Sequence, residues 1–365
     1  MRVLFLDVEH AWDGSARAFA AAARGLAARG HHVTFVCPPD SPVEERLDYA
    51  AYEVLPLDLA GAWPLAAWKL RHVLALRFVE VVFVHRGREH LLAAAASRMA
   101  GRAALMRRVP SGQAVTVTRR DQLALRLAPT GWMFSAEEAL HAAPPELARR
   151  IPPAVVTPGV DVGSYDAVRP AARSALGAGG TERMIVCLYD LTSRVRAALA
   201  LRTVALLAPL HPQLGLVFVG PGSDSEDLRM HAAALGITRR VSFLGERDDL
   251  LSIIRAADLG WVASQGDNAL FAYLDLLALR VPVLAERDGM AQRYVANGIT
   301  GLLLTPDDPP GTAAAVARAL AHEEERGAMG AAARARVSRD FTAEGMVDAF
   351  ERAALGAADR TLWLS

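Results

Sequence analysis

Lysine is nearly absent from this sequence: Lys69 is the one lysine among 40 basic residues, and the others are arginines. Charge of one sign is also lacking, because the formal net charge is zero. The composition therefore gives no electrostatic case for a nucleic-acid partner or an acidic membrane. Hydrophobic residues make up 52% and charged residues 22% of 365 residues, which is typical of a globular α/β protein with one large or two medium domains.

Long apolar runs are missing as well, and none reaches the length of a transmembrane segment. The N-terminal apolar run meets Asp7 and Glu9 too early for a signal peptide. We therefore expect a cytoplasmic protein, and peripheral contact with the inner face of the membrane stays open. The two cysteines, Cys37 and Cys187, each end an apolar run typical of a strand. This position favours buried free thiols over a disulfide or a metal site.

The first half of the chain alternates apolar runs with helical segments, which is typical of a Rossmann-like parallel sheet. Ligands of such sheets bind beyond the carboxyl ends of the strands. Asp13 and Gly14 follow the first predicted strand, and His85 and Arg107 follow two later ones. We therefore expect these residues near a binding site, with ordinary structural or surface roles as the alternative. Gly14 is not part of a Gly-x-Gly-x-x-Gly pattern, so a dinucleotide fingerprint is absent.

The most informative stretch of the second half is 263–286, which reads as a loop, a helix and a buried strand. Residues 266–268 are of types that favour a turn, and they predict the N-cap of the helix. Asp267 and Asp275 stand eight positions apart. An anionic ligand would be favoured at this helix N-terminus. The two carboxylates would then accept hydrogen bonds from hydroxyls of the same ligand, as in a nucleotide-sugar site. The alternative is an ordinary cap at Asp267 and a solvated Asp275.

Several segments of the sequence together resemble the group 1, or family four, glycosyltransferases of the GT-B type. They are TPGVDVGSYD, LGLVFVGPGSD, VSFLGERDDL, IIRAAD, LDLLALRVPVLA and ANGITGLLLTPDDP. The resemblance covers nearly the whole chain and implies an α/β GT-B fold, with two facing Rossmann-like domains, parallel sheets and an interdomain cleft. Residues 152–180 are rich in proline, glycine, alanine and serine, which predicts a domain boundary near Val168. The resemblance makes residues 1–167 an acceptor domain and residues 168–342 a nucleotide-sugar donor domain. The helix and tail over 343–365 would pack back on the first domain.

The resemblance also implies a reaction. The family transfers a sugar from a nucleotide-diphosphate sugar, usually with retention of configuration, and many members act in cell-envelope or polysaccharide biosynthesis. It is generally metal-independent, so we expect no metal and no cofactor besides the donor as co-substrate. The acceptor is a sugar, a lipid or another small molecule that the sequence does not identify, and no nucleic acid is expected as a partner.

The resemblance assigns predicted site residues to the donor side and to the acceptor side. Asp267 and Asp275 fall on the family's two acids, which touch the sugar hydroxyls and the ribose. The expected donor contacts are Gly220, Gly245, Asp267, Asn268, Asp275 and Gly289, and the expected acceptor-side residues are Asp13, Gly14, His85 and Arg107.

In this family an arginine and a lysine, here called the clamp, hold the diphosphate of the donor. The sequence departs from the family pattern most clearly at these two positions. Asp190 stands where the family has the arginine that holds the diphosphate, and Val195 stands where it has the lysine. Arg194 and Arg196 each lie one position from the lysine site, and we predict that they supply the catalytic charge. The alternative is that both are ordinary exposed helix arginines.

Three functions therefore stay open. The first is a glycosyltransferase, and the second is a GT-B scaffold without catalysis that binds nucleotide sugars or assists assembly. A sugar-nucleotide epimerase of the same fold ranks last, because the loops of the first half do not resemble that family.

Overall fold

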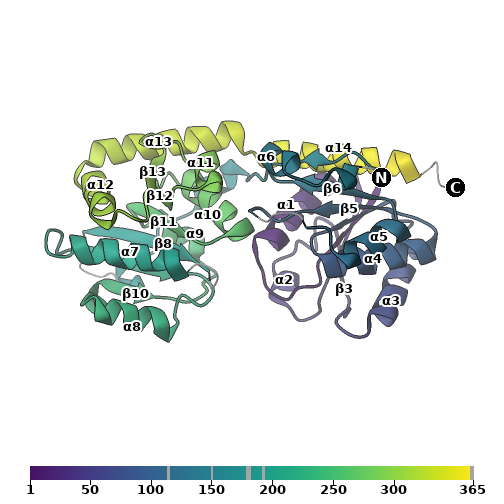
Figure 1. Cartoon of the computed structure of the whole chain (residues 1–365), viewed down its shortest axis with the longest axis horizontal. Coiled ribbons are helices and arrows are strands. Elements are labelled where there is room, and N and C mark those ends of the chain that lie inside the picture. The colour runs from purple at the N-terminus through teal and green to yellow at the C-terminus, as the bar shows by residue number, and fades with distance from the viewer. Residues whose placement is uncertain (113–115, 149–150, 178–181, 191–193, 362–365) are drawn as a thin grey trace. The chain divides into compact units, whose positions relative to one another are not determined.

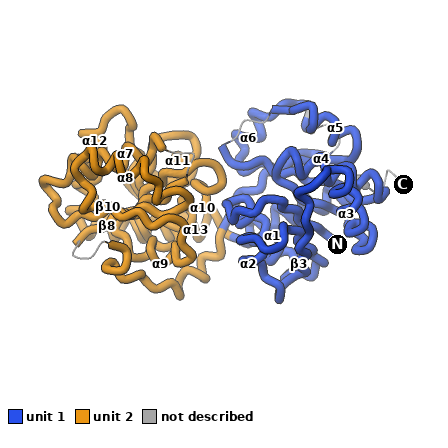
Figure 2. The backbone as a smooth tube through the Cα atoms, turned by 90° about the horizontal axis from the view of Figure 1, so that it is seen from below, with its two compact units in different colours: residues 1–159, 343–365 blue, residues 160–342 orange. Residues whose placement is uncertain are grey.

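The computed structural model describes residues 1–112, 116–148, 151–177, 182–190 and 194–361. The chain forms two compact units, residues 1–159 with 343–365 and residues 160–342 (Figure 2). The division falls at Val160, ahead of the position near Val168 that composition suggested. The backbone N–H of Val160 donates to the carbonyl of Phe341 at 3.0 Å, and Val160 forms a parallel bridge with Thr342. These contacts attach residues 160–167 to the second unit.

The first unit is built on a seven-stranded sheet of order β3-β2-β1-β4-β5-β6-β7, in which every pairing is parallel. Its strands are β1 Arg2–Leu6, β2 His32–Cys37, β3 Glu53–Pro56, β4 Val81–Val84, β5 Ala104–Arg108, β6 Thr130–Phe134 and β7 Ala154–Val155. Its α-helices are α1 Gly14–Ala28, α2 Pro42–Glu45, α3 Trp63–Leu76, α4 Gly87–Ala100, α5 Arg119–Leu127, α6 Glu137–His141 and α14 Ala343–Thr361.

Helices cover both faces of the first sheet (Figure 1). On one face α1 and α14 pack against Phe5 and Phe83, and Phe350 of α14 lies 5.3 Å from the Phe83 ring. On the other face α3, α4 and α5 pack against Leu4 and Val82. Strands buried on both faces read as continuous apolar runs, which is why the sequence pattern reveals them.

The second unit is built on a six-stranded sheet of order β10-β9-β8-β11-β12-β13, again with parallel pairings throughout. Helices α7, α8 and α12 cover one face, and α10 packs beside α9 and α13. The strands are β8 Arg183–Tyr189, β9 Leu214–Val219, β10 Val241–Phe243, β11 Leu259–Ala263, β12 Val283–Glu286 and β13 Gly301–Leu304. The α-helices are α7 Arg194–Leu207, α8 Glu226–Ala234, α9 Leu250–Arg255, α10 Gly266–Ala278, α11 Gly289–Tyr294, α12 Pro309–Ala321 and α13 Glu323–Asp340. The 3₁₀ turns of the chain are η1 Pro145–Ala148, η2 Val162–Ala167, η3 Arg173–Leu176 and η4 Thr238–Arg240.

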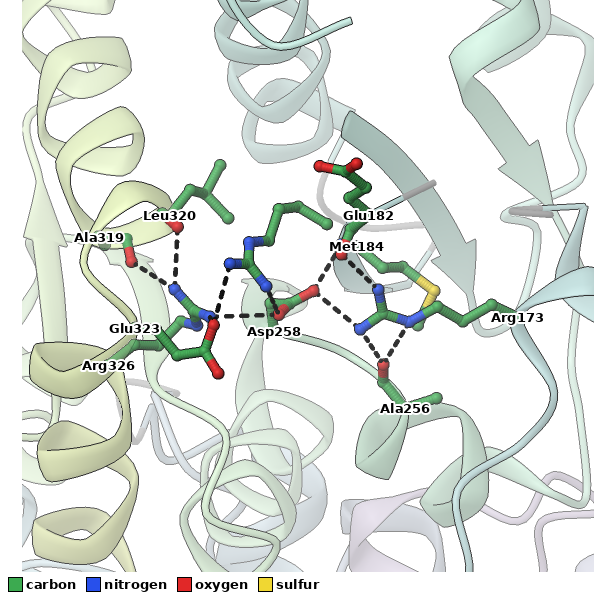
Figure 3. Close-up of polar contacts among 10 residues, drawn as sticks. Arg173, Glu182, Met184, Ala256, Asp258, Ala319, Leu320, Glu323 and Arg326 are labelled. Carbon is green, nitrogen blue, oxygen red and sulfur yellow. Dashed lines mark hydrogen bonds and ion pairs between the residues drawn. The ribbon is translucent and has the colours of Figure 1, made fainter. Parts of the chain in front are cut away.

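In the second unit, three arginines lie around the carboxylate of Asp258. Its oxygens lie 2.8 Å from Arg173, 3.5 Å from Arg183 and 3.5 Å from Arg326 (Figure 3). It also accepts a hydrogen bond of 2.8 Å from the backbone N–H of Met184. We call these residues the Asp258 cluster. It joins η3, the start of β8 and the start of α13, and the exposed carboxylate of Glu323 lies 3.1 Å from Arg183 beside it.

Two further predictions concern the chain as a whole. Across the described ranges, no helix is both long and apolar enough to span a bilayer. Cys37 and Cys187 are buried free thiols, as their positions in the sequence indicated. Burial raises the pKa of the Cys37 thiol to about 12, so this sulfur is a poor nucleophile at neutral pH.

Candidate functional site

The candidate donor site lies at the carboxyl edge of the second sheet, where β8 and β11 are neighbours. Tyr189 at the end of β8 is in register with Ala263 at the end of β11. The next residue, Asp190, is 5% exposed, and its Oδ2 accepts a hydrogen bond of 2.9 Å from the backbone N–H of Gln265. A carboxylate of the protein therefore already lies at the beginning of α10. Residues 191–193, which belong to the predicted clamp segment, lie outside the described residues.

Helix α10 begins earlier than the sequence predicted. Gly266 is its first residue and Gln265 is its N-cap, so the predicted cap at residues 266–268 is wrong. Gly266 has a φ of 60°, a left-handed conformation that favours glycine, and the chain turns into the helix there. Asp267 and Asn268 consequently lie in the first turn, and Asp267 is 6% exposed. A carboxylate in this turn complements the positive end of the helix dipole.

Asp275 is more buried than a solvated helix residue. It is 1% exposed, and its Oδ1 accepts a hydrogen bond of 2.5 Å from the hydroxyl of Tyr165 in η2. Any ribose contact of Asp275 has to share this carboxylate with Tyr165. The sequence analysis missed Tyr165, although it stands within the TPGVDVGSYD segment that carries the family resemblance.

The two arginines predicted for the clamp differ in surroundings. Arg194 is 66% exposed and pairs with Asp227 at 2.8 Å, an exposed contact of little energetic weight. Arg196 is only 17% exposed, and its guanidinium lies 2.6 Å from Asp288 and 3.9 Å from Glu286. Burial alone would lower the pKa of Arg196, but its hydrogen bond to Asp288 and the charge of Glu286 raise that pKa. Arg196 is therefore a fixed cation at the sheet edge.

A buried tyrosine completes this group of charges. Tyr273 of α10 is fully buried, and within the described part of the chain its hydroxyl has no hydrogen-bond partner. Burial raises the pKa of Tyr273, and Asp288 adds to the shift, so the phenol stays neutral. Burial also raises the pKa of Glu286, while Arg196 opposes that effect. We call Arg196, Tyr273, Glu286 and Asp288 the Arg196 cluster.

The three predicted donor-side glycines occupy different settings. Gly220 has a φ of 126°, and a Cβ added to it would lie 2.1 Å from the carbonyl oxygen of Tyr189, so only glycine fits. Its N–H donates to the carbonyl of Gly245 at 2.9 Å. Gly220 and Gly245 thus hold the loops after β9 and β10 against each other. Gly289 begins α11, and a Cβ added there would meet no atom within 4 Å.

In the first unit, Asp13 and Gly14 lie at the start of α1. Asp13 is the N-cap: its Oδ1 accepts hydrogen bonds from the N–H groups of Ser15 at 2.9 Å and Ala16 at 3.0 Å. Its Oδ2 lies 2.8 Å from the guanidinium of Arg86, which directly follows His85. The buried His85 ring stacks on Phe19 at 3.4 Å between centroids.

Arg107 lies in a separate group of contacts. Its guanidinium pairs with the buried carboxylate of Asp121 and lies 4.6 Å from the centre of the Trp132 ring. His90 is 3.5 Å from the same carboxylate. Burial lowers the pKa of Arg107, while Asp121 opposes the shift. Arg107 of β5 therefore holds α5 to the sheet through Asp121.

Two buried acids at the edge of the first sheet were not recognised as site candidates from the sequence. Asp7 follows β1 directly and is 3% exposed, and the buried carboxylate of Glu89 accepts backbone hydrogen bonds from His85, Arg86 and Val8. Burial raises the pKa of Asp7 from 3.8 to about 8, and the charge of Glu89 adds to this shift. The signal available in the sequence was an acid immediately after a buried strand.

This shift predicts a pH dependence of stability. Because the pKa of Asp7 is higher in the folded chain, its stabilising protonation is complete below about pH 4 and is lost as the pH rises through about 8. Between about pH 4 and 8, the stability of an Asp7→Asn variant should therefore decrease less steeply with pH, by up to about 1.4 kcal/mol per pH unit. Urea unfolding at several pH values measures both slopes. Equal slopes in the two proteins would show that Asp7 is ionised in the folded chain.

Within the ranges that the structure describes, no group of three His, Cys, Asp or Glu side chains lies close enough to hold a metal ion.

Comparison with known proteins gives a family match within the second unit. Residues 168–336 match the family model described as glycosyl transferases group 1. The chain is 33% identical over 189 residues to a D-inositol 3-phosphate glycosyltransferase of Corynebacterium jeikeium, which covers 48% of this chain and 45% of that protein. It is 33% identical over 213 residues to the enzyme of that name from Corynebacterium urealyticum, covering 54% and 50%. The matched region thus spans about half the length of these curated relatives.

Solved structures resemble the chain over almost its whole length. HepE of Anabaena in complex with UDP and glucose has a TM-score of 0.76 at 19% identity, covering 96% of this chain and 98% of that one. Sucrose-phosphate synthase from Thermosynechococcus elongatus has a TM-score of 0.71 at 19% identity, covering 100% and 99%. At this identity the likeness concerns the fold alone. It confirms the predicted GT-B class with two Rossmann-like parallel sheets.

Proposed function

We propose, starting from the membership of residues 168–336 in the group 1 glycosyltransferase family, that the whole chain transfers a sugar from a nucleotide-diphosphate sugar to an acceptor with retention of configuration. The observation that carries the proposal is the carboxyl edge of the second sheet. There Asp267 lies in the first turn of α10, and the cation of Arg196 lies at the same edge. The UDP-glucose bound in the structure of HepE supports UDP-glucose as the first donor to test.

The chemistry that these residues would perform is mainly electrostatic. Arg196 would offset the negative charge that develops on the departing diphosphate, as preorganised charges do in transfer reactions. Asp267 and Asn268 would contact sugar hydroxyls or phosphate at the start of α10, and Asp275 would hold the ribose beside Tyr165. The open space at Gly289 would let backbone N–H groups approach the donor.

The acceptor side belongs to the same proposal. Asp13, Gly14 and His85 share the carboxyl edge of the first sheet with Asp7, and Arg107 would support them from the next strand. The acceptor is a sugar, a lipid or a small molecule of undefined structure. We further propose a cytoplasmic location and a role in cell-envelope or polysaccharide synthesis.

Asp190 favours a second function, that of a GT-B scaffold which binds nucleotide sugars without transferring them. Its carboxylate lies at the N-terminus of α10, where it would repel a diphosphate. Arg196 is already paired with Asp288, so the cation available to the donor is partly neutralised. A scaffold of this kind would bind the sugar and nucleoside parts of the ligand and leave the glycosidic bond intact.

Donor binding tests both functions. We expect UDP-glucose, or another of the common UDP-, GDP- and ADP-sugars, to raise the melting temperature of the full chain. An Asp267→Asn variant should bind that donor at least about tenfold more weakly, because hydrogen bonds to a charged carboxylate are stronger than bonds to an amide. The matched control is Asp307→Asn, which changes an exposed acid in the loop before α12.

The outcomes separate the two functions. Binding accompanied by release of the nucleotide supports the transferase, and binding without release supports the scaffold. If no nucleotide or nucleotide sugar changes the melting temperature, both functions are wrong.

A further inference from the structure

Asp288 connects two elements of the second unit, because each of its carboxylate oxygens has a different partner. Its Oδ1 accepts a hydrogen bond of 2.7 Å from the backbone N–H of Ala291 and so caps α11. Its Oδ2 accepts a hydrogen bond of 2.6 Å from the guanidinium of Arg196 in the first turn of α7. Capping needs no charge, because asparagine is as good an N-cap as aspartate. What the charge of Asp288 adds is its ion pair with Arg196.

The two members of this ion pair differ in their access to water. The side chain of Arg196 is 17% exposed, whereas that of Asp288 is 34% exposed. The carboxylate can therefore turn toward water more easily than the guanidinium can. A diphosphate presents the same kind of partner to the guanidinium as a carboxylate does, since both offer charged oxygens that pair with two of its N–H groups. Asp288 and a diphosphate would thus compete for one cation.

A second acid, Glu286, keeps Arg196 at the sheet edge independently of Asp288. Its Oε2 lies 3.9 Å from the guanidinium, a longer contact than that of Asp288. Its Oε1 is buried, and within the described residues this oxygen has no hydrogen-bond partner. The side chain of Glu286 is 12% exposed, so its acid group turns into water less easily than that of Asp288. The cation beside Glu286 therefore stays in place when the charge of Asp288 is removed.

We propose that Asp288 competes with the diphosphate of the donor for Arg196, and that this competition limits the affinity of the site for donor and product. Before the donor binds, Arg196 pairs with Asp288. When the donor arrives, its phosphate oxygens take over the guanidinium, and Asp288 keeps its hydrogen bond to the N–H of Ala291. Weaker binding of the nucleoside diphosphate helps this product to leave after transfer, a step that is slow in many enzymes. The inference rests on the proposed function, because its ligand is a nucleoside diphosphate group.

An Asp288→Asn variant tests this competition, because it removes the charge and keeps a side-chain oxygen that can cap α11. The probes are UDP, GDP and ADP, and isothermal titration calorimetry gives their dissociation constants with the full chain. The variant should bind the nucleotide that the unmodified chain prefers at least about threefold more tightly, because a partly exposed ion pair no longer opposes the ligand. A purely structural role of Asp288 predicts weaker or unchanged binding.

Three further variants identify the cause of a gain in affinity. Asp307→Asn removes an exposed acid from the loop before α12, and it should bind the nucleotide as the unmodified chain does. Arg196→Ala and the double variant Arg196→Ala/Asp288→Asn should have dissociation constants that differ less than about twofold, because no cation remains for Asp288 to release.

Two results would overturn the proposal. The first is that Asp288→Asn binds the nucleotide no more tightly than the unmodified chain. The second is an equal gain in the Arg196→Ala background, which would mean that Asp288 repels the ligand directly. If the unmodified chain and the variants bind none of the three nucleotides, the proposed function is wrong as well, so the two failures give different results. Circular dichroism of each variant confirms that it is folded.

Discussion

An Arg196→Ala variant is expected to transfer sugar at least about 100-fold more slowly than the unmodified chain, with donor affinity reduced much less. The reason is that a fixed positive charge stabilises the departing diphosphate more than the intact donor. Arg194 provides a direct comparison, because it lies close to Arg196 in the chain but is much more exposed. Both residues lie in the first turn of α7, yet Arg196 is 17% exposed and Arg194 is 66% exposed. The rate of nucleotide release from the donor, measured as kcat and KM separately, gives the result.

The control for this prediction is Arg194→Ala, which should change the rate less than about twofold. Arg196→Lys should restore part of the rate, because it keeps the charge but loses the planar guanidinium that pairs with Asp288. If Arg194→Ala and Arg196→Ala slow the reaction equally, Arg196 has no special role at the diphosphate. Circular dichroism is needed in each case, because removing Arg196 leaves Asp288 and Glu286 without their cation.

Replacing Asp258 with alanine is expected to lower the free energy of unfolding of the second unit by about 3–5 kcal/mol. The variant removes the one carboxylate that contacts all three arginines of the cluster. It leaves only the 76% exposed Glu323 beside Arg183 and Arg326 (Figure 3). Arg326 cannot move into water easily, because it is 7% exposed and donates to the carbonyls of Ala319 and Leu320. Urea unfolding or calorimetry measures the loss, which corresponds to a melting temperature lower by about 10 °C.

Asp249→Ala is the matched control for the Asp258 cluster. Asp249 pairs with Arg247 at 2.8 Å, but both side chains are more than 40% exposed, so its loss should change stability little. Asp258→Asn separates charge from hydrogen bonding, because the amide oxygen can still accept from the N–H of Met184. If Asp258→Ala unfolds at the same urea concentration as the unmodified chain, the three arginines do not depend on this acid.

Much of the fold could be predicted from the sequence because parallel strands carry their signal locally. Runs such as the one in β8 are apolar without interruption since both faces of the strand are buried, and the helices between them follow in regular order. Helix α5 was missed, although Thr118 and Asp121 form a capping box at its start. Its few buried side chains produce a weak apolar pattern, which explains the omission.

The candidate site was less predictable, because its contacts join residues that are far apart in the chain. The hydroxyl of Tyr165 reaches Asp275 across 110 positions, and Asp190 reaches the N–H of Gln265 across 75. The family resemblance marked Asp267 and Asp275 and showed that the usual clamp is absent. It did not predict which groups of the protein these residues contact. Asp7 and Glu89 show the same limit, since burial by other strands and helices raises their pKa values.

The amino-acid sequence by itself indicated the order of most strands and helices, the parallel sheets and the two buried free thiols. These properties depend on residue type and short-range periodicity. Only the tertiary structure distinguished the surroundings of Arg194 from those of Arg196, because two positions along a helix differ by about 200° and the sheet lies on one side of it. It likewise left Leu65, Trp68 and Leu76 of α3 exposed to solvent, while Leu70 and Leu74 of the same helix are buried. Which face of a helix is covered depends on what packs against it, and the helix's own sequence does not contain that information.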